Sequence, residues 1–238
     1  MKETFVYDRN PPMSGIEDIG KERYCLSCLD DMVNDIPFLR MKEGYTLVAE
    51  MVSGFHGAMT AIWAVPEDRV GEGYEEVELS GLFRPIPTDA SDAFRMSEEA
   101  RIKRPLHAEP MMRAIEGTGS ALSYLAASLL ARAALDVEAS WHGIAWGFYR
   151  LLYVDIWAEV INVEKRKRRS GRWNINEDPG PLTPTISFEE GTVTVVFHAY
   201  TPLWERRIFR FTDTYTRGNY EFNTEYRVLA SSRGGIMV

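Results

Sequence analysis

The sequence predicts an α+β protein in which a predominantly helical N-terminal two-thirds is followed by a C-terminal antiparallel sheet of about four strands. Two observations support this fold class. In the segments 16–36, 42–64, 111–135 and 136–172, apolar residues recur at three- and four-residue steps, the period of one face of an α-helix. Beyond residue 184 they alternate with polar residues, as in strands with one buried face.

The change of pattern also predicts how the chain is organised. Asn10, Pro11 and Pro12 exclude regular helix near the start. We expect an extended arm, a mainly helical core region, a linker, a β region packed on the helices, and a C-terminal tail. These correspond, in order, to residues 1–15, 16–172, 173–184, 185–230 and 231–238.

The segment 136–172 has the most regular helical pattern. Apolar residues line one face over 141–163, and most off-face positions are apolar as well, which is typical of a central helix. Gly171 can supply the left-handed residue that ends a helix. Cations near the end favour the negative end of the helix dipole, and the segment has six of them, Lys165, Arg166, Lys167, Arg168, Arg169 and Arg172.

Two earlier segments also carry helical spacing. Residues 16–36 suit a short helix that ends before Pro37, because the residue before a proline disfavours helical geometry. Residues 42–64 fit either a helix or a hairpin of Tyr45–Val52 and Ala58–Val65. We favour the helix because few residues there are β-branched.

A further helix is expected over 111–135, rich in Ala and Leu. Gly117 and Gly119 interrupt its pattern, so we expect a break there, after which Thr118 or Ser120 caps a second piece.

Alternation predicts the strands of the C-terminal sheet. Glu190-Gly191 and Gly218-Asn219 are turn signals between the predicted strands. The strands are expected around residues 186–188, 193–199, 208–215 and 220–228.

Composition excludes some classes of function. The chain has 238 residues, 45% of them hydrophobic, and a formal net charge of -8. This acidity argues against general affinity for nucleic acid or anionic membrane. No apolar run has signal-peptide or membrane-span length. We expect no membrane partner, no secretion by signal peptide, and a cytoplasmic or virion location.

Cys25 and Cys28 have the CxxC spacing of a zinc or redox pair. The sequence nearby offers no second pair of ligands and no βαβ context. We therefore favour ordinary buried cysteines and expect neither a metal nor a cofactor.

Glu138 and His142 are the best catalytic candidates. On a helix they lie one turn apart, so the carboxylate could orient the imidazole for proton transfer or metal binding. His56 joins them if two helices cross at their glycines. A histidine hydrogen-bonded within a core or an interface is the favoured alternative.

The basic block at 165–172, with Trp173 after it, is the best nucleic-acid feature, since cations bind phosphates and an aromatic ring stacks on bases. A helix C-terminus prefers the same cations. The acidic stretch 67–78 of a second copy is another partner for this block, in a head-to-tail contact.

The C-terminal sheet is dense in aromatic residues interleaved with arginines, among them Arg206 and Arg207. Aromatic residues and arginine are enriched where subunits meet. This pattern favours a surface for other protein subunits, with self-association preferred.

These observations favour a non-catalytic structural or assembly subunit of a larger homo- or hetero-oligomeric complex, of which virion neck, tail and capsid-associated proteins are examples. One alternative is a small-molecule enzyme or binding protein using His142, Glu138 and His56. A second is a nucleic-acid-binding module that uses the basic block.

Overall fold

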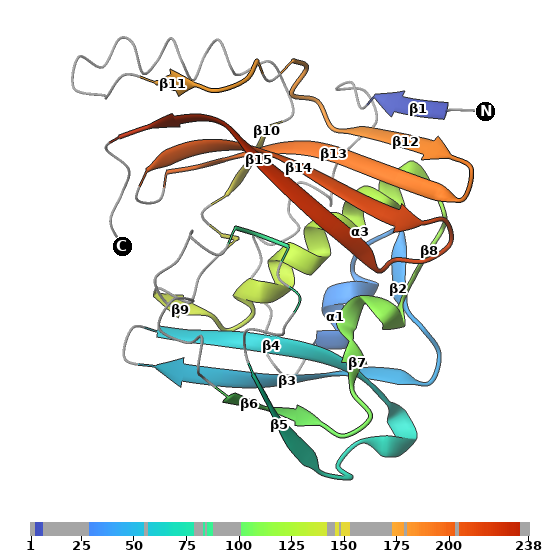
Figure 1. Ribbon diagram of the computed structural model, residues 1–238. Coiled ribbons are helices and arrows are strands. Elements are labelled where there is room, and N and C mark those ends of the chain that lie inside the picture. The colour runs from blue at the N-terminus through green and yellow to red at the C-terminus, as the bar shows by residue number, and fades with distance from the viewer. Residues whose placement is uncertain are drawn as a thin grey trace. The chain divides into compact units, whose positions relative to one another are not determined.

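The protein, seen here in a computed structural model, is mostly β with several antiparallel sheets (Figure 1). It forms two compact units. The N-terminal unit comprises Ser14–Gly147 and the turn Thr216–Glu221, and the C-terminal unit comprises the rest. The structure describes residues 3–6, 29–54, 57–78, 83, 85–87, 101–141, 146–147, 149–152, 173–178, 180–202 and 205–233.

The predicted helical N-terminal two-thirds is wrong. Among the described residues, the α-helices are α1 (Leu29–Asn34) and α3 (Ala121–Ala133). Strands dominate the N-terminal unit: β2 (Leu39–Met41), β3 (Tyr45–Gly54), β4 (Gly57–Pro66), β5 (Tyr74–Glu78), β6 (Arg101–Pro105), β7 (Glu109–Pro110), β8 (Ile115–Gly117) and β9 (Ser140–Trp141).

These strands form three small antiparallel sheets. One has the order β3-β4-β7, with β9 also paired to β4, and the other two are the pairs β2-β8 and β5-β6. In this sheet β4 is the central strand, because other strands pair with both of its edges.

The hairpin β3–β4 replaces the helix predicted over 42–64. Its register runs without interruption from Tyr45 opposite Pro66 to Gly54 opposite Gly57. Ala61, Trp63, Ala64 and Val65 are all buried, although they point to both faces of β4. A strand buried on both faces reads as a continuous apolar run, which periodicity cannot distinguish from a buried helix. The hairpin that was the weaker sequence alternative is the structure observed.

The helix predicted over 136–172 is wrong wherever the structure describes it. Ser140–Trp141 form β9, and Arg150–Leu152 form β10 in the C-terminal unit. A 3₁₀ turn covers Ala134–Asp136. Residues 142–145, 148 and 153–172 of the segment lie outside the described residues.

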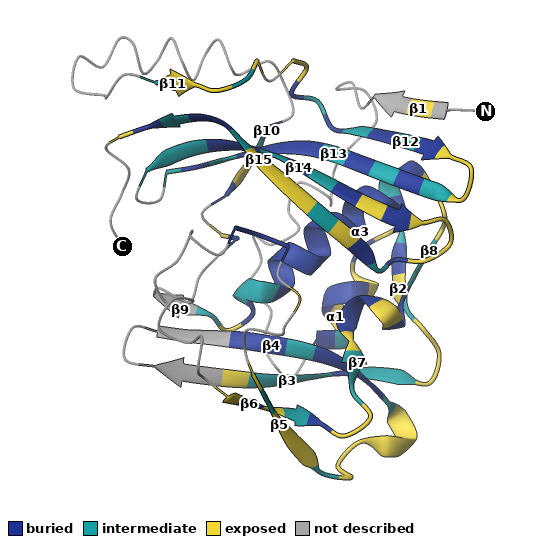
Figure 2. Cartoon of the chain, in the orientation of Figure 1, coloured by how far each residue is buried: buried dark blue, intermediate teal, exposed yellow. Residues whose placement is uncertain are grey.

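The helix α3 begins where the sequence predicted a second piece to begin. Ser120 is its N-cap, and its hydroxyl accepts a hydrogen bond from the Ser123 backbone N–H at 3.3 Å. Residues 111–117 form a 3₁₀ turn and β8 instead of a first helical piece. Every residue of α3 except Leu122 is buried (Figure 2).

The turn between β14 and β15 packs on α3 through Tyr220. Its ring stacks on Tyr124 with the centroids 4.9 Å apart. Its hydroxyl accepts the Gly119 N–H at 3.0 Å and lies 2.7 Å from Ser123 Oγ. Gly218 N–H donates to the Tyr124 hydroxyl at 2.8 Å. Residues about a hundred positions apart in the sequence therefore share one polar and aromatic cluster.

The C-terminal unit contains one antiparallel sheet, larger than the four strands predicted. Its order is β1-β12-β13-β14-β15-β11, with β10 also paired to β13. The strands not yet given are β1 (Glu3–Val6), β11 (Asn174–Ile175), β12 (Thr185–Glu189), β13 (Thr192–Thr201), β14 (Arg206–Thr216) and β15 (Phe222–Ser232).

Alternation sets the two faces of this sheet. Val193, Val195, Phe197 and Ala199 of β13 are fully buried, whereas Thr192, Thr194 and Val196 between them are half-buried. Phe209 and Phe211 continue the buried face on β14, where Phe197 stacks on Phe211 at 5.3 Å. The aromatic residues expected at a subunit interface are mostly buried within the chain itself, and Tyr226 is the exposed exception among those described.

Two N-terminal features have described parts. The arm contributes β1, which pairs antiparallel with β12 of the same chain. The helix α1 ends before Pro37 as predicted, and residues 16–28 of the predicted helix lie outside the described residues. No helix in the described part of the chain is both long and apolar enough to span a bilayer.

The contact between Gly117 and Tyr220 generates a prediction about stability. A Cβ at Gly117 would lie 2.3 Å from the Tyr220 hydroxyl oxygen and 2.4 Å from Cζ, and the stacked ring has little freedom to move. We expect Gly117→Ala to lower the free energy of unfolding by about 1–3 kcal/mol, as overpacking does, measured by urea denaturation.

The matched control is the same substitution in a Tyr220→Ala background. There the added methyl group has room, so Gly117→Ala should change stability by less than about 0.5 kcal/mol. An equal loss in both backgrounds would show that the ring is not the obstacle.

Candidate functional site

Most of the predicted site residues lie outside the part of the chain that the structure describes. This applies to His56 and His142, to Cys25 and Cys28, and to the basic block, Lys165, Arg166, Lys167, Arg168, Arg169 and Arg172. The expectations about them stay predictions.

Glu138 is described, and its position removes the argument that paired it with His142. It is exposed and lies in a turn with φ 52°, not on a helix, so the one-turn spacing does not apply. The strand pairing of β4 with β9 places Gly57 opposite Trp141. These two residues directly follow His56 and directly precede His142 in the sequence.

Trp173, Arg206 and Arg207 are half-buried in the C-terminal unit. Trp173 packs against a cluster of Leu152, Leu182, Ile208 and Leu229. Arg207 Nε lies 3.2 Å from Glu205 Oε2. These side chains are partly committed to contacts within their own unit.

The acidic stretch 67–78 includes β5, which pairs with the basic strand β6. Arg104 binds Glu75, its direct cross-strand partner, and Arg101 lies 3.4 Å from Glu76. Opposite charges thus face each other across the two strands, which we call the β5–β6 ribbon. Its carboxylates are compensated within the chain, which weakens the case for a head-to-tail contact with a basic block.

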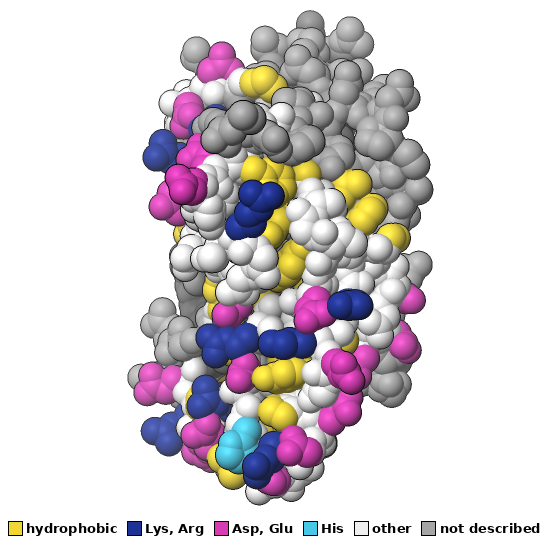
Figure 3. Space-filling model, turned by 90° about the vertical axis from the view of Figure 1, so that its right-hand side faces the viewer, with side chains coloured by type: hydrophobic (Ala, Val, Ile, Leu, Met, Phe, Trp, Pro, Cys, Tyr) yellow, Lys and Arg dark blue, Asp and Glu magenta, His cyan; other side chains and the backbone are white. Residues whose placement is uncertain are grey.

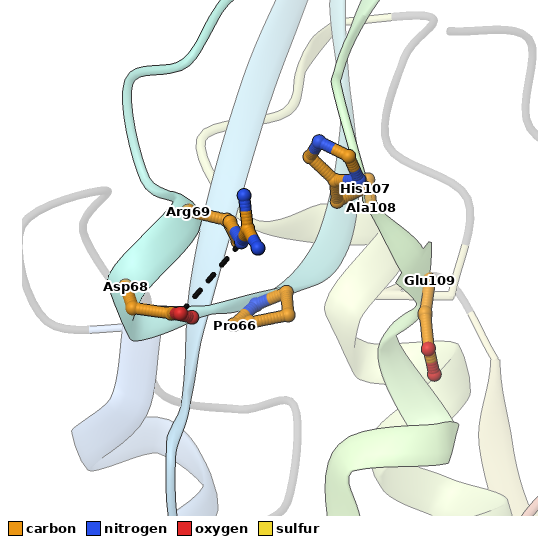
Figure 4. A pocket seen from close by; sticks show the side chains of 6 residues that line it. All are labelled: Pro66, Asp68, Arg69, His107, Ala108 and Glu109. Atoms are coloured by element: carbon orange, nitrogen blue, oxygen red, sulfur yellow. Dashed lines mark ion pairs between the residues drawn. The ribbon is translucent and has the colours of Figure 1, made fainter.

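A surface hollow of about 520 Å³ lies beside the β5–β6 ribbon. Figure 4 shows Asp68 and Arg69 on the turn after β4, His107 and Ala108 on the segment before β7, and Glu109 on β7, with Pro66 between the two groups. The charged groups are linked through Glu72, whose carboxylate lies 3.2 Å from both Arg69 Nη1 and His107 Nε2. Exposed ion pairs of this kind contribute little to the stability of the fold, and their main effect is on the charge pattern of the surface.

His107 adopts the left-handed backbone region, with φ 62°. It lies in a tight turn in which Ala108 N–H donates to Pro105 O at 3.2 Å. Glycine is the usual residue at such a position, because a side chain there is strained. The side chain that occupies it reaches Glu72 at the edge of the hollow.

Three large apolar side chains are exposed next to this hollow. Val70, Tyr74 and Leu106 are 51%, 55% and 36% exposed. Leu106 N–H donates to Gly73 O at 3.0 Å, and Tyr74 pairs with Pro105 across the ribbon, so the three belong to one end of it. We call Val70, Tyr74 and Leu106, with Arg69, Glu72 and His107, the ribbon-end surface.

The C-terminal unit holds a second polar cluster, and this one is buried. His198 on β13 is 3% exposed. Its Nδ1 lies 3.3 Å from Leu182 O, and its Nε2 accepts from Arg210 Nε at 3.4 Å. Arg210 Nη1 in turn binds Glu177 Oε1 at 2.5 Å. The two contacts of the imidazole require opposite roles, so it is neutral, with the proton on Nδ1.

The pKa of His198 is lowered from 6.5 to about 4. Burial is the main cause, and the positive charge of Arg210 acts in the same direction. The hydrogen bond to Leu182 O raises the pKa, without offsetting the other two effects. At neutral pH the ring is therefore uncharged. It donates a hydrogen bond through Nδ1, accepts one through Nε2, and does not act as an acid.

The sequence alone assigned no role to His198, Arg210 or Glu177. Glu177, His198 and Arg210 are distant in the sequence, and only the register of β13, β14 and β15 brings them together. Among the described residues, no group of three or more His, Cys, Asp and Glu side chains is arranged to hold a metal ion.

Comparisons with protein-family models, with curated proteins and with solved structures find no match to this chain.

The lowered pKa of His198 predicts a pH dependence of stability. The unfolded chain takes up this proton near pH 6.5 and the folded chain only near 4, so acidification favours unfolding in between. The contribution is complete above about pH 6.5 and declines as the pH falls toward 4. Between about pH 7 and pH 5 we expect a loss of about 2 kcal/mol in the free energy of unfolding, measured by urea denaturation.

In the variant His198→Asn, which has no titratable ring, the part of the pH dependence that comes from His198 should be absent, and the parts that come from other groups should remain. An unchanged slope in the variant would contradict the assignment to His198.

The strained turn at His107 gives a second prediction. His107→Ala and His107→Gly both remove the contact with Glu72, but only glycine relieves the left-handed strain. The glycine variant should be more stable than the alanine variant by about 1 kcal/mol in chemical denaturation. Equal stabilities would mean that the turn relaxes when the side chain is shortened.

Proposed function

We propose that this chain is a non-catalytic assembly subunit that associates with further copies of itself through the ribbon-end surface. The observation that carries the proposal is the exposure of Val70, Tyr74 and Leu106 together, beside a hollow lined by charged residues. Interfaces are built around aromatic and aliphatic side chains that fill pockets on the partner, with a polar rim around them.

The composition of this surface supports self-association. It carries both signs of charge, with Arg69 beside Asp68 and Glu72. The lower end of Figure 3 shows the same mixture, with hydrophobic side chains between positive and negative ones. A surface that contains both halves of its ion pairs can pair with a copy of itself about a twofold axis, the commonest symmetry of homo-oligomers.

We also propose, more narrowly, that the assembly is part of a virion, as a neck, tail or capsid-associated component. The nucleic-acid alternative depends on the basic block, and the enzyme alternative on His56 and His142, which all lie outside the described residues. Neither gains an observation comparable to the ribbon-end surface, so neither is advanced here.

The test is the molar mass of the intact chain at tens of micromolar, measured by light scattering after size exclusion. We expect a mass above the 27.2 kDa of one chain. Tyr74→Ala combined with Leu106→Ala should weaken association at least about tenfold, because truncating central anchors typically removes more than about 1 kcal/mol each.

Ile175→Ala is the matched control, since this side chain is also exposed, at 53%, but lies on β11 of the C-terminal unit. It should leave the mass unchanged. A clean monomer for the unaltered chain, or an oligomer that the double variant leaves intact, would refute the proposal.

A further inference from the structure

The segment that contains β11 and leads into β12 is held on the C-terminal sheet by a small set of contacts. This segment, 173–178 and 180–184 among the described residues, is called the strap. Asn176 and Glu177 both donate their backbone N–H to Leu229 O, at 2.8 and 3.2 Å. Leu182 is 1% exposed and packs with Leu152, Ile208 and Leu229 of the sheet. The strap thus covers an apolar cluster.

His198 and Arg210 on the sheet bind the strap through their side chains, in addition to the β11–β15 pairing and the bonds of Asn176 and Glu177 to β15. His198 Nδ1 bonds the strap carbonyl of Leu182, and Arg210 binds the strap carboxylate of Glu177. The two are also joined to each other, by the Arg210 Nε–H that donates to His198 Nε2 at 3.4 Å. The link between His198 and Arg210 depends on an unprotonated Nε2, because a proton there would replace the acceptor by a second cation facing Arg210, the residue that holds the strap carboxylate of Glu177.

Among the described residues, the other charged groups on the elements around His198 add no negative charge that binds its ring. Arg227 lies opposite Arg210 in the β14–β15 register and adds positive charge. On β10, Leu152 is the cross-strand partner of His198, and Arg150 pairs with Tyr200 two residues further along. On the strap, Asp178 accepts a hydrogen bond from Gly180 N–H at 3.0 Å. Glu177 is the one carboxylate described as joined to this cluster, and it is already bound by Arg210.

The closed strap also buries a polar atom. Among the described residues, no acceptor reaches the buried indole N–H of Trp173, the first residue of the strap. A buried donor without an acceptor favours any conformation that exposes it to water.

We propose that the strap is a pH-gated element: its contacts with unprotonated His198 and Arg210 keep it on the sheet at neutral pH, and protonation of His198 releases it and uncovers Ile208 and Leu229. The lowered pKa of His198 agrees with this, since a proton that is resisted in the closed state is taken up more readily in the open one. Release is local, because the strap is bound by few hydrogen bonds while β12 to β15 keep their ladders.

Hydrogen–deuterium exchange of the full chain tests the proposal, with protection factors corrected for the intrinsic pH dependence of exchange. Between about pH 7 and pH 5, the opening constant for the amides of Asn176 and Glu177 should rise roughly twentyfold, if the open strap returns His198 to its ordinary pKa. The amides that pair β12 with β13 should open much less. A strap protection that does not change with pH would overturn the proposal.

Variants distinguish release of the strap by protonation of His198 from a general loss of stability in acid. His198→Asn keeps a donor toward Leu182 O without a titratable ring, so its strap should stay protected at both pH values. Glu190→Gln, at the exposed turn between β12 and β13 of the same unit, should keep the full pH response. An unaltered response in His198→Asn refutes the proposal.

A further variant covers the case in which His198→Asn fails to fold. Glu177→Gln removes the carboxylate that Arg210 binds, so it should raise exchange at the strap already at pH 7 while leaving the β12–β13 amides unchanged. Unchanged exchange at the strap in Glu177→Gln equally overturns the proposal.

Discussion

The burial of α3 on nearly every side is the constraint on which the N-terminal unit depends. A helix without a solvent-facing stripe has to place each of its polar groups against a protein partner. Ser123 and Tyr124 meet the turn that carries Gly218 and Tyr220, and Arg132 donates to Ser128 O with its guanidinium 5.8 Å from the centre of the Trp146 ring. The turn 216–221 is therefore part of the packing of this unit and not a surface loop.

Two histidines show how environment separates the two units chemically. His107 is exposed, held in a strained turn and surrounded by charges that water screens, so its contacts contribute little to the fold and remain available to a partner. His198 is buried between a backbone carbonyl and an arginine, where an unpaired polar group or an extra charge is costly. The exposed cluster suits recognition, and the buried one suits control of local structure.

The sequence predicted the parts of the fold whose signals are local. Ser120 marks the start of α3, and alternation with the Glu190-Gly191 turn marks β12 and β13, where Gly191 has φ 73°. It failed at β4, because burial of the consecutive residues Trp63, Ala64 and Val65, which point to both faces, removes the two-residue period. The His198–Arg210–Glu177 cluster was beyond sequence reasoning for another reason: it depends on how β13, β14 and the segment after β11 are placed across the sheet.

The sequence distance between Gly119 and Tyr220, which are joined by a hydrogen bond across 101 positions, matters for a chain emerging from the ribosome. Synthesis of residues 1–147 leaves α3 without the ring that stacks on Tyr124, so the helix exposes apolar surface until residue 221 has been made. Closing such long-range contacts is slow compared with forming local hairpins. The nascent N-terminal segment is thus the stage at which this protein is most exposed to misassociation and to capture by chaperones.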